Sequence, residues 1–350
     1  MENHKQLFIT LIFGLFIISS CKNTPKTEYY KLQGETMGTY YAITFEGSNP
    51  DELKEKVDSI LIDVNNALST YIPSSTISSI NSSKETSFAI QDVHSHFDNV
   101  YQIAQEIEGK TNGYLNTAIA PLVNHWGFGF TPKEKISSVD SQKVQQLLSL
   151  IDSSTLNIVK KNNNELEVVK KPIHAQFDYS SIAKGYGIDH ICNYLRKEGY
   201  TNFLVDIGGE ARAEGKNPSA QLWTLAISKP KEDAAPSDLE VIVQLDDMSM
   251  ATSGNYRQFY EVDGKKFAHI INPKTGFPAL SNLLSATVIA KDCATADGYA
   301  TSLMVMGYEE AKTYIEKNEL IACLIYDENG DDELEKYFSK SFVNYTIPKE

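Results

Sequence analysis

Short strand-like segments joined by tight turns alternate with amphipathic helical segments along most of this chain. Leu156–Val159 and Leu166–Val169 flank an asparagine-rich turn and predict a β-hairpin, and Asp263-Gly264 is a strong hairpin turn. Helical patterns interrupt the strands, as over residues 53–68, where apolar residues recur every three or four positions. Hairpins mixed with helices favour an α+β fold, with mixed or antiparallel sheets and packed helices, over a doubly wound parallel sheet.

The length of the chain allows a large buried core. With 350 residues and neither an internal repeat nor a long linker, we expect one large domain of two intimate lobes over residues 32–346. The formal net charge of −14 argues against nucleic acid or an anionic membrane surface as the main partner. An anionic substrate would then need a local source of positive charge, such as a metal ion.

The N-terminus has the pattern of a targeting segment. Lys5 precedes an apolar stretch over residues 7–18, which is short for a permanent membrane span. The sequence Ile18-Ser-Ser-Cys21 resembles the lipobox of bacterial lipoproteins. That resemblance implies a signal peptide over residues 1–20, a lipidated Cys21 carrying palmitate, and a tether over residues 21–31. The chain would then be anchored in the bacterial cell envelope and face the periplasm. An ordinary signal peptide with an incidental cysteine is the alternative.

Two segments near the C-terminus carry residues suited to phosphate chemistry. His269 lies at the end of a predicted strand, before a turn through Pro273 and Gly276. Asp297 and Thr301 begin a predicted helix and share one face, because residues four apart are stacked along a helix. A carboxylate and a hydroxyl near a helix N-terminus suit a hard divalent cation and a phosphate group. Histidine can move a proton near neutral pH. A capped helix with a surface hydroxyl is the alternative interpretation.

Five further segments combine glycine with polar residues. They are Gly34-Glu-Thr-Met-Gly-Thr39, Tyr114-Leu-Asn-Thr-Ala-Ile-Ala-Pro-Leu122 with Trp126-Gly-Phe-Gly129, Asp178-Tyr-Ser-Ser-Ile-Ala-Lys-Gly185, Asp206-Ile-Gly-Gly-Glu210 and Thr252-Ser-Gly-Asn-Tyr-Arg257. Together with His269–Pro278 and Ala296–Gly307, they run in order along nearly the whole mature chain. In this order they resemble the motifs of the ApbE-like family, the FAD:protein FMN transferases.

The resemblance implies a reaction. The family cleaves FAD and joins the FMN half, through its phosphate, to a threonine or serine hydroxyl of a partner protein, releasing AMP. FAD would be the substrate and Mg²⁺ the metal, because a departing pyrophosphate oxygen needs charge neutralisation. The acceptor would be an extracytoplasmic redox protein.

The resemblance also implies roles for single residues. Ser181, Asp297 and Thr301 match metal-binding positions, and His269 is expected to be the general base. The expected FAD contacts are Met37, Tyr71, Tyr114, Leu115, Asn116, Asp178, Lys184 and Ile271. Taken alone, the apolar and aromatic members of this set are more often core residues. Lys184 could equally be a solvated lysine, and Asp178 could cap a helix starting at Ser180.

Two positions depart from the usual family pattern. Asn272 and Asn116 stand where aspartate is common. The first change removes a charge beside His269, although an amide can still hold the turn.

Other functions stay open at this point. A hydrolase with the same residues would use water in place of the acceptor hydroxyl and yield FMN and AMP. A non-catalytic flavin-binding lipoprotein would be expected to lack His269, Asp297 or Thr301, all of which are present. A structural surface lipoprotein is the fourth reading, and neither repeats nor linkers support it.

Overall fold

The computed structural model describes residues 28–131, 139–152, 154–162, 164–235, 237–256, 259–262, 265–331 and 333–347. The expected signal peptide and Cys21 lie outside these residues. The expected tether extended to residue 31, which is wrong for its last four residues, because β1 already begins at Glu28. Within the described part of the chain, no helix has the length and apolar character needed to cross a membrane.

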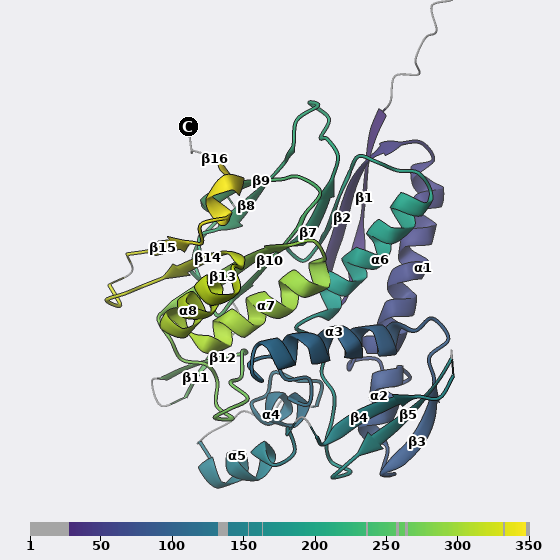
Figure 1. Ribbon diagram of the computed structural model, residues 1–350, viewed down its shortest axis with the longest axis vertical. Coiled ribbons are helices and arrows are strands. Elements are labelled where there is room, and N and C mark those ends of the chain that lie inside the picture. The colour runs from purple at the N-terminus through teal and green to yellow at the C-terminus, as the bar shows by residue number, and fades with distance from the viewer. Residues whose placement is uncertain are drawn as a thin grey trace, which may run out of the picture.

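An antiparallel sheet of eight strands forms the centre of the molecule (Figure 1). Its strand order is β1-β2-β6-β7-β10-β13-β14-β15, and every neighbouring pair is antiparallel. The strands are β1 (Glu28–Thr36), β2 (Thr39–Gly47), β6 (Phe203–Ile207), β7 (Glu210–Glu214), β10 (Ser249–Gly254), β13 (Leu283–Ala290), β14 (Ile321–Tyr326) and β15 (Glu335–Phe338). This arrangement confirms the predicted α+β class with antiparallel sheets.

Three smaller sheets surround the large one. They consist of β16 (Thr346–Ile347), β9 (Leu239–Leu245) and β8 (Trp223–Ser228); of β3 (Ser87–Gln91), β5 (Glu165–Lys170) and β4 (Leu156–Lys160); and of β11 (Phe259–Val262) with β12 (Lys265–Ala268). The β4–β5 pair is the hairpin that the sequence predicted. The turn at 263–264 lies outside the described residues, but the strands that flank it do pair.

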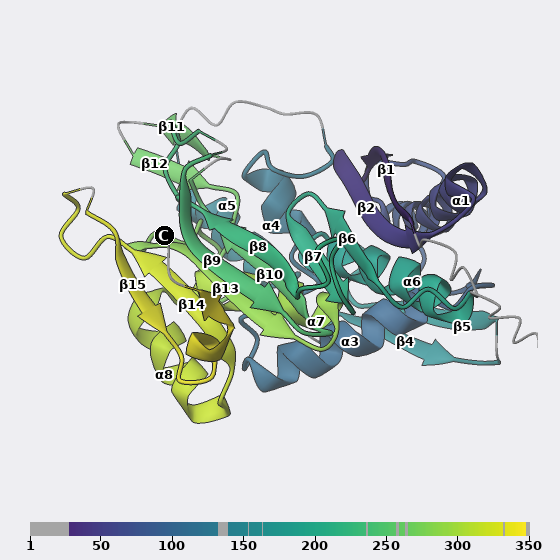
Figure 2. The same ribbon diagram turned by 90° about the horizontal axis from the view of Figure 1, so that it is seen from above.

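Helices cover one face of the large sheet, and the β8–β9 sheet covers the other (Figure 2). The helices are α1 (Pro50–Leu68), α2 (Thr76–Ser82), α3 (His96–Lys110), α4 (Ala120–His125), α5 (Ser141–Leu148), α6 (Ala183–Lys197), α7 (Cys293–Met306) and α8 (Tyr308–Asn318), and a 3-10 turn, η1, spans Phe342–Tyr345. Strand alternation produces this layering. In β13, Val288 belongs to the cluster that includes Leu303 of α7, whereas Ile289 packs with Val243 of β9.

The contact between α6 and α7 is unusually close. An ideal Cβ at Gly185 would lie 2.4 Å from the carbonyl oxygen of Cys293, so only glycine fits there. One turn further on, the two carboxylate oxygens of Asp189 accept hydrogen bonds from the backbone amides of Cys293 and Ala294, both at 2.9 Å. Asp292, the residue that directly precedes α7, makes no side-chain capping bond. The N-terminus of α7 is therefore capped by a side chain of α6.

A histidine cluster joins α3 to α6. The rings of His96 and His190 lie 4.7 Å apart, and Tyr186 lies 4.5 Å from His190. The Tyr186 hydroxyl is 3.1 Å from Nδ1 of His96. Burial, assisted by the neighbouring His96, lowers the pKa of His190 to about 4. The folded protein therefore keeps His190 neutral.

We expect Asp189→Ala to destabilise the protein by about 1–2 kcal/mol, because two helix amides lose their acceptor. Asp292→Ala, at the exposed residue that makes no cap, is the matched control and should cost less than about 0.5 kcal/mol. Urea unfolding followed by circular dichroism measures both. Equal effects of the two substitutions would contradict the capping role of Asp189.

The stability of the protein should depend on His190 in acid. The unfolded chain takes up a proton at His190 below about pH 6.5, whereas the folded protein does so only near pH 4. Protonation therefore favours unfolding, and this contribution is present above pH 6.5 and lost as the pH falls toward 4. Unfolding free energies at about pH 7.5 and about pH 5 should differ less in His190→Gln than in the wild type. An unchanged difference would contradict this assignment.

Candidate active site

One cleft of about 1120 Å³ brings the predicted site residues together. All twelve residues expected at the cofactor, metal and catalytic positions line it: Met37, Tyr71, Tyr114, Leu115, Asn116, Asp178, Ser181, Lys184, His269, Ile271, Asp297 and Thr301. They come from segments as far apart as the β1–β2 turn and α7. Their gathering is a finding of the structure, whereas their individual roles stay predictions.

Oxygen donors cluster where α7 begins. Asp297 is 2% exposed, and its Oδ2 accepts a hydrogen bond of 3.1 Å from the backbone amide of Gly185. Burial raises the pKa of Asp297, and the nearby Lys184 ammonium opposes that rise. Thr301 Oγ1 lies 3.1 Å from Oγ of Ser253, a cleft residue of β10 that the sequence did not single out as a ligand.

This donor set suits a hard cation. One buried carboxylate, that of Asp297, lines the cleft together with the hydroxyls of Thr301, Ser253 and Ser181. Across the described ranges, no three His, Cys, Asp or Glu side chains are grouped so that they could hold a metal. Carboxylate, hydroxyl and carbonyl oxygens are the ligands that Mg²⁺ accepts, and a transition metal would favour nitrogen or sulfur. The residues present therefore fit a magnesium ion.

Lys184 is flanked by two carboxylates. Its ammonium lies 3.7 Å from Oε1 of Glu210, and Asp297 contributes most to raising the pKa of Lys184. Glu210 is 5% exposed and lines the cleft; burial raises the pKa of its carboxyl, and the Lys184 ammonium opposes that rise. The sequence interpretation treated Gly208-Gly209-Glu210 only as a turn that lets the backbone approach a ligand. A glutamate following two glycines gave no signal that its side chain would be buried beside Lys184.

Met37, in the β1–β2 turn, lines the cleft. Met37 and Gly38 both have positive φ, of 50° and 72°. The Met37 methyl would lie 3.0 Å from a Cβ at Gly187, so this side chain packs directly on α6. Leu115 and Ile271 also line the cleft, but they are 2% and 6% exposed and belong to the main core cluster. Leu115 and Ile271 are therefore core residues that also line the cleft, and their contact with FAD stays a prediction.

Two tyrosines stand at the cleft with different surroundings. Tyr71 is 68% exposed, and its hydroxyl donates a hydrogen bond of 3.4 Å to the carbonyl oxygen of Phe128. Tyr114 donates to the carboxylate of Glu310, and the Lys274 ammonium lies 3.4 Å from the centre of its ring. An exposed aromatic at a cleft is available to stack on a planar ligand, which is the role predicted for Tyr71.

Asp178 and Asn116 hold loops as well as lining the cleft. Oδ1 of Asp178 accepts hydrogen bonds from the amide, at 2.8 Å, and the hydroxyl of Ser180, as the capping alternative predicted. The predicted helix start at Ser180 is wrong, since residues 180–182 form the capped turn and α6 begins at Ala183. Asn116 donates to the carbonyl oxygen of Ile151 at 2.7 Å. An ionised aspartate could not make that bond.

The turn after His269 is held by Asn272. Its Oδ1 accepts hydrogen bonds from the amides of Lys274, at 2.8 Å, and Thr275, at 3.3 Å. The prediction that an amide can hold this turn is therefore confirmed. His269 itself lines the cleft, with its ring 6.3 Å from that of Phe128.

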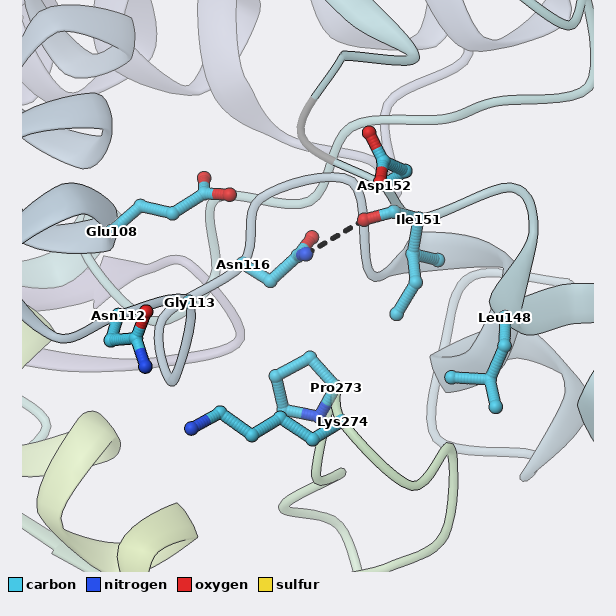
Figure 3. Close-up of a pocket in the computed structure, with 9 residues that line it drawn as sticks. All are labelled: Glu108, Asn112, Gly113, Asn116, Leu148, Ile151, Asp152, Pro273 and Lys274. Carbon is cyan, nitrogen blue, oxygen red and sulfur yellow. Dashed lines mark hydrogen bonds between the residues drawn. The ribbon is translucent and has the colours of Figure 1, made fainter.

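A side cavity of about 260 Å³ adjoins the cleft (Figure 3). Asn116 and Pro273 line both spaces. Figure 3 shows Glu108 extending toward Asn116 on one side of the cavity and Lys274 on the other. Burial raises the pKa of Glu108 to about 7. The cleft therefore continues into a polar recess between α3 and the Asn272 turn.

Comparison with known proteins identifies relatives over nearly the whole chain. The FAD:protein FMN transferase of Haemophilus influenzae is 35% identical over 353 residues, which cover 99% of this chain and all of the relative. The FAD:protein FMN transferase of Vibrio cholerae is 34% identical over 342 residues, covering 96% and 97%.

Solved structures agree with the sequence relatives. The flavin transferase ApbE from Vibrio cholerae superposes with a TM-score of 0.80 at 34% identity, over 91% of this chain and 99% of that one. The apo form of the Pseudomonas stutzeri flavinyl transferase ApbE also gives 0.80, at 28% identity, over 91% and 97%. A model of the ApbE family matches residues 37–325. The chain therefore belongs to the ApbE family.

Proposed function

We propose that this protein transfers the FMN half of FAD to a threonine or serine hydroxyl of a partner protein and releases AMP, with Mg²⁺ as the metal. The observation that carries the proposal is the meeting of Asp297, Thr301, Lys184 and His269 at one cleft, in a chain of the ApbE family. Its relatives over nearly full length are FAD:protein FMN transferases.

Different residues of the cleft would bind the metal, the phosphates and the flavin ring. Asp297, Thr301 and Ser181 would hold the metal, which when bound would neutralise charge on the pyrophosphate. The Lys184 ammonium supplies a second positive charge for a phosphate oxygen. Met37 and Tyr71 offer an apolar and an aromatic surface to the flavin ring. In a chain with a net charge of −14, the metal and Lys184 would supply the local positive charge that the pyrophosphate linkage needs.

The transfer step requires one proton to move. His269 takes the proton from the acceptor hydroxyl as that oxygen attacks the FMN phosphorus. The new bond joins the acceptor oxygen to phosphorus, and the bond from phosphorus to the bridging oxygen breaks. AMP leaves with that oxygen. Attack by water instead would give free FMN and AMP.

Mass spectrometry of a redox-protein domain with a candidate acceptor threonine tests the transfer. After incubation with FAD, Mg²⁺ and residues 22–350 of this chain, we expect a covalent FMN adduct and released AMP, both abolished by EDTA.

Asp297→Ala should slow transfer by about a hundredfold or more, because the only buried acid among the expected metal-binding residues is lost. Asp292→Ala, at an exposed residue just before α7, should transfer normally. AMP without an adduct would favour hydrolysis, and no AMP despite bound FAD would reject both reactions.

We also propose that the protein is lipid-anchored in the bacterial cell envelope through Cys21 and faces the periplasm, which the lipobox-like sequence 18–21 supports. Expressed in a bacterium with radiolabelled palmitate, the full chain should become labelled and sediment with membranes. Cys21→Ser should abolish the label and release the chain, because the thiol that carries the lipid is gone. Unchanged labelling of Cys21→Ser would contradict the anchor.

A further inference from the structure

Glu210 is a buried acid of the cleft, and one of its two carboxylate oxygens has no hydrogen-bond partner. It begins β7, directly after Gly208 and Gly209, whose φ values are +63° and +106°. Its side chain is 7% exposed. Among the described residues, four buried side-chain atoms lack a hydrogen-bond partner, and of these only Oε2 of Glu210 belongs to a residue that lines the cleft.

Burying such a group has a cost. A carboxylate removed from water without full hydrogen bonding destabilises the folded state, whereas an aliphatic side chain of similar size would not. Packing alone therefore does not explain why a glutamate occupies this position. The compensating interaction lies on the other oxygen, where Oε1 is 3.7 Å from the Lys184 ammonium.

Lys184 has two acidic neighbours that compete for it. Asp297 is the strongest electrostatic influence on Lys184, and Glu210 is another. Asp297 already uses one oxygen to accept the Gly185 amide. If Glu210 were neutral, Asp297 would be the main counter-charge left to Lys184. The ammonium would then move onto Asp297 and occupy the oxygen that a cation needs.

We propose that Glu210 is a positioning residue: it holds the Lys184 ammonium away from Asp297, so that Asp297 stays available to a divalent cation and Lys184 stays available to a phosphate. This inference rests on the proposed function of the cleft. It makes Glu210 act through Lys184 rather than on the cation directly, and that distinction can be measured.

The test is a double-mutant cycle on Mn²⁺ binding, followed by electron paramagnetic resonance without FAD. Glu210→Gln keeps the shape of the side chain and should weaken Mn²⁺ binding about tenfold, a coupling typical of charged groups in contact. In a Lys184→Met background the same substitution should change the affinity by less than about twofold, because the group that would move onto Asp297 is absent.

A matched control is Glu108→Gln, which neutralises another buried carboxylate, in the side cavity. It should leave Mn²⁺ affinity unchanged. Thermal melting of each variant establishes that it is folded.

Equal weakening by Glu210→Gln in both backgrounds would overturn the inference, because Glu210 would then act on the cation itself. No weakening in either background would overturn it as well. Failure of the wild type to bind either Mn²⁺ or FAD would instead contradict the proposed function together with this inference. The wild type could transfer FMN normally while the effects of Glu210→Gln and Lys184→Met on Mn²⁺ affinity simply add. That result would support the proposed function and reject only the role of Glu210.

Discussion

The close contact between α6 and α7 is the constraint on which the rest of the site depends. Gly185 allows the two helices to touch, its amide orients Asp297, and Asp189 caps the helix that carries Asp297 and Thr301. Lys184 precedes Gly185 on the same helix. The spacing between the Lys184 ammonium and the Asp297 carboxylate is therefore set by helix packing, which is rigid, rather than by a loop.

Much of the fold could be predicted where apolar periodicity is strong. The β4–β5 hairpin and helices α1 and α6 follow from their patterns, although α6 begins three residues later than predicted. Strand β7, with the sequence Glu-Ala-Arg-Ala-Glu, has no such pattern and was missed. The strand can be buried because the Arg212 guanidinium donates hydrogen bonds to Glu214 and Ser249. These two acceptors lie far apart from one another in sequence. Helix α2 is equally polar and starts with the Ser75 cap, a local signal too common to be decisive.

The candidate site was predicted more completely than the fold, for a different reason. Its residues were found by resemblance of ordered motifs, and all twelve line the same cleft. What the motifs did not supply is the environment of each side chain. Ser253 beside Thr301, and Glu210 beside Lys184, are neighbours created only by strand pairing and helix packing. Likewise, the amide at Asn116 is explained by its hydrogen bond to the carbonyl oxygen of Ile151, thirty-five residues away.

The spread of the cleft along the chain has a consequence for biogenesis. Met37 lies near the first described residue and Thr301 lies in α7, so contacts of very high sequence separation must form before the cleft exists. Such contacts form late and slowly, because loop-closure entropy has to be overcome first. A chain still being synthesised would therefore lack the complete cleft until almost all of it had been released. Ligand binding in the cleft would thus report that folding is complete.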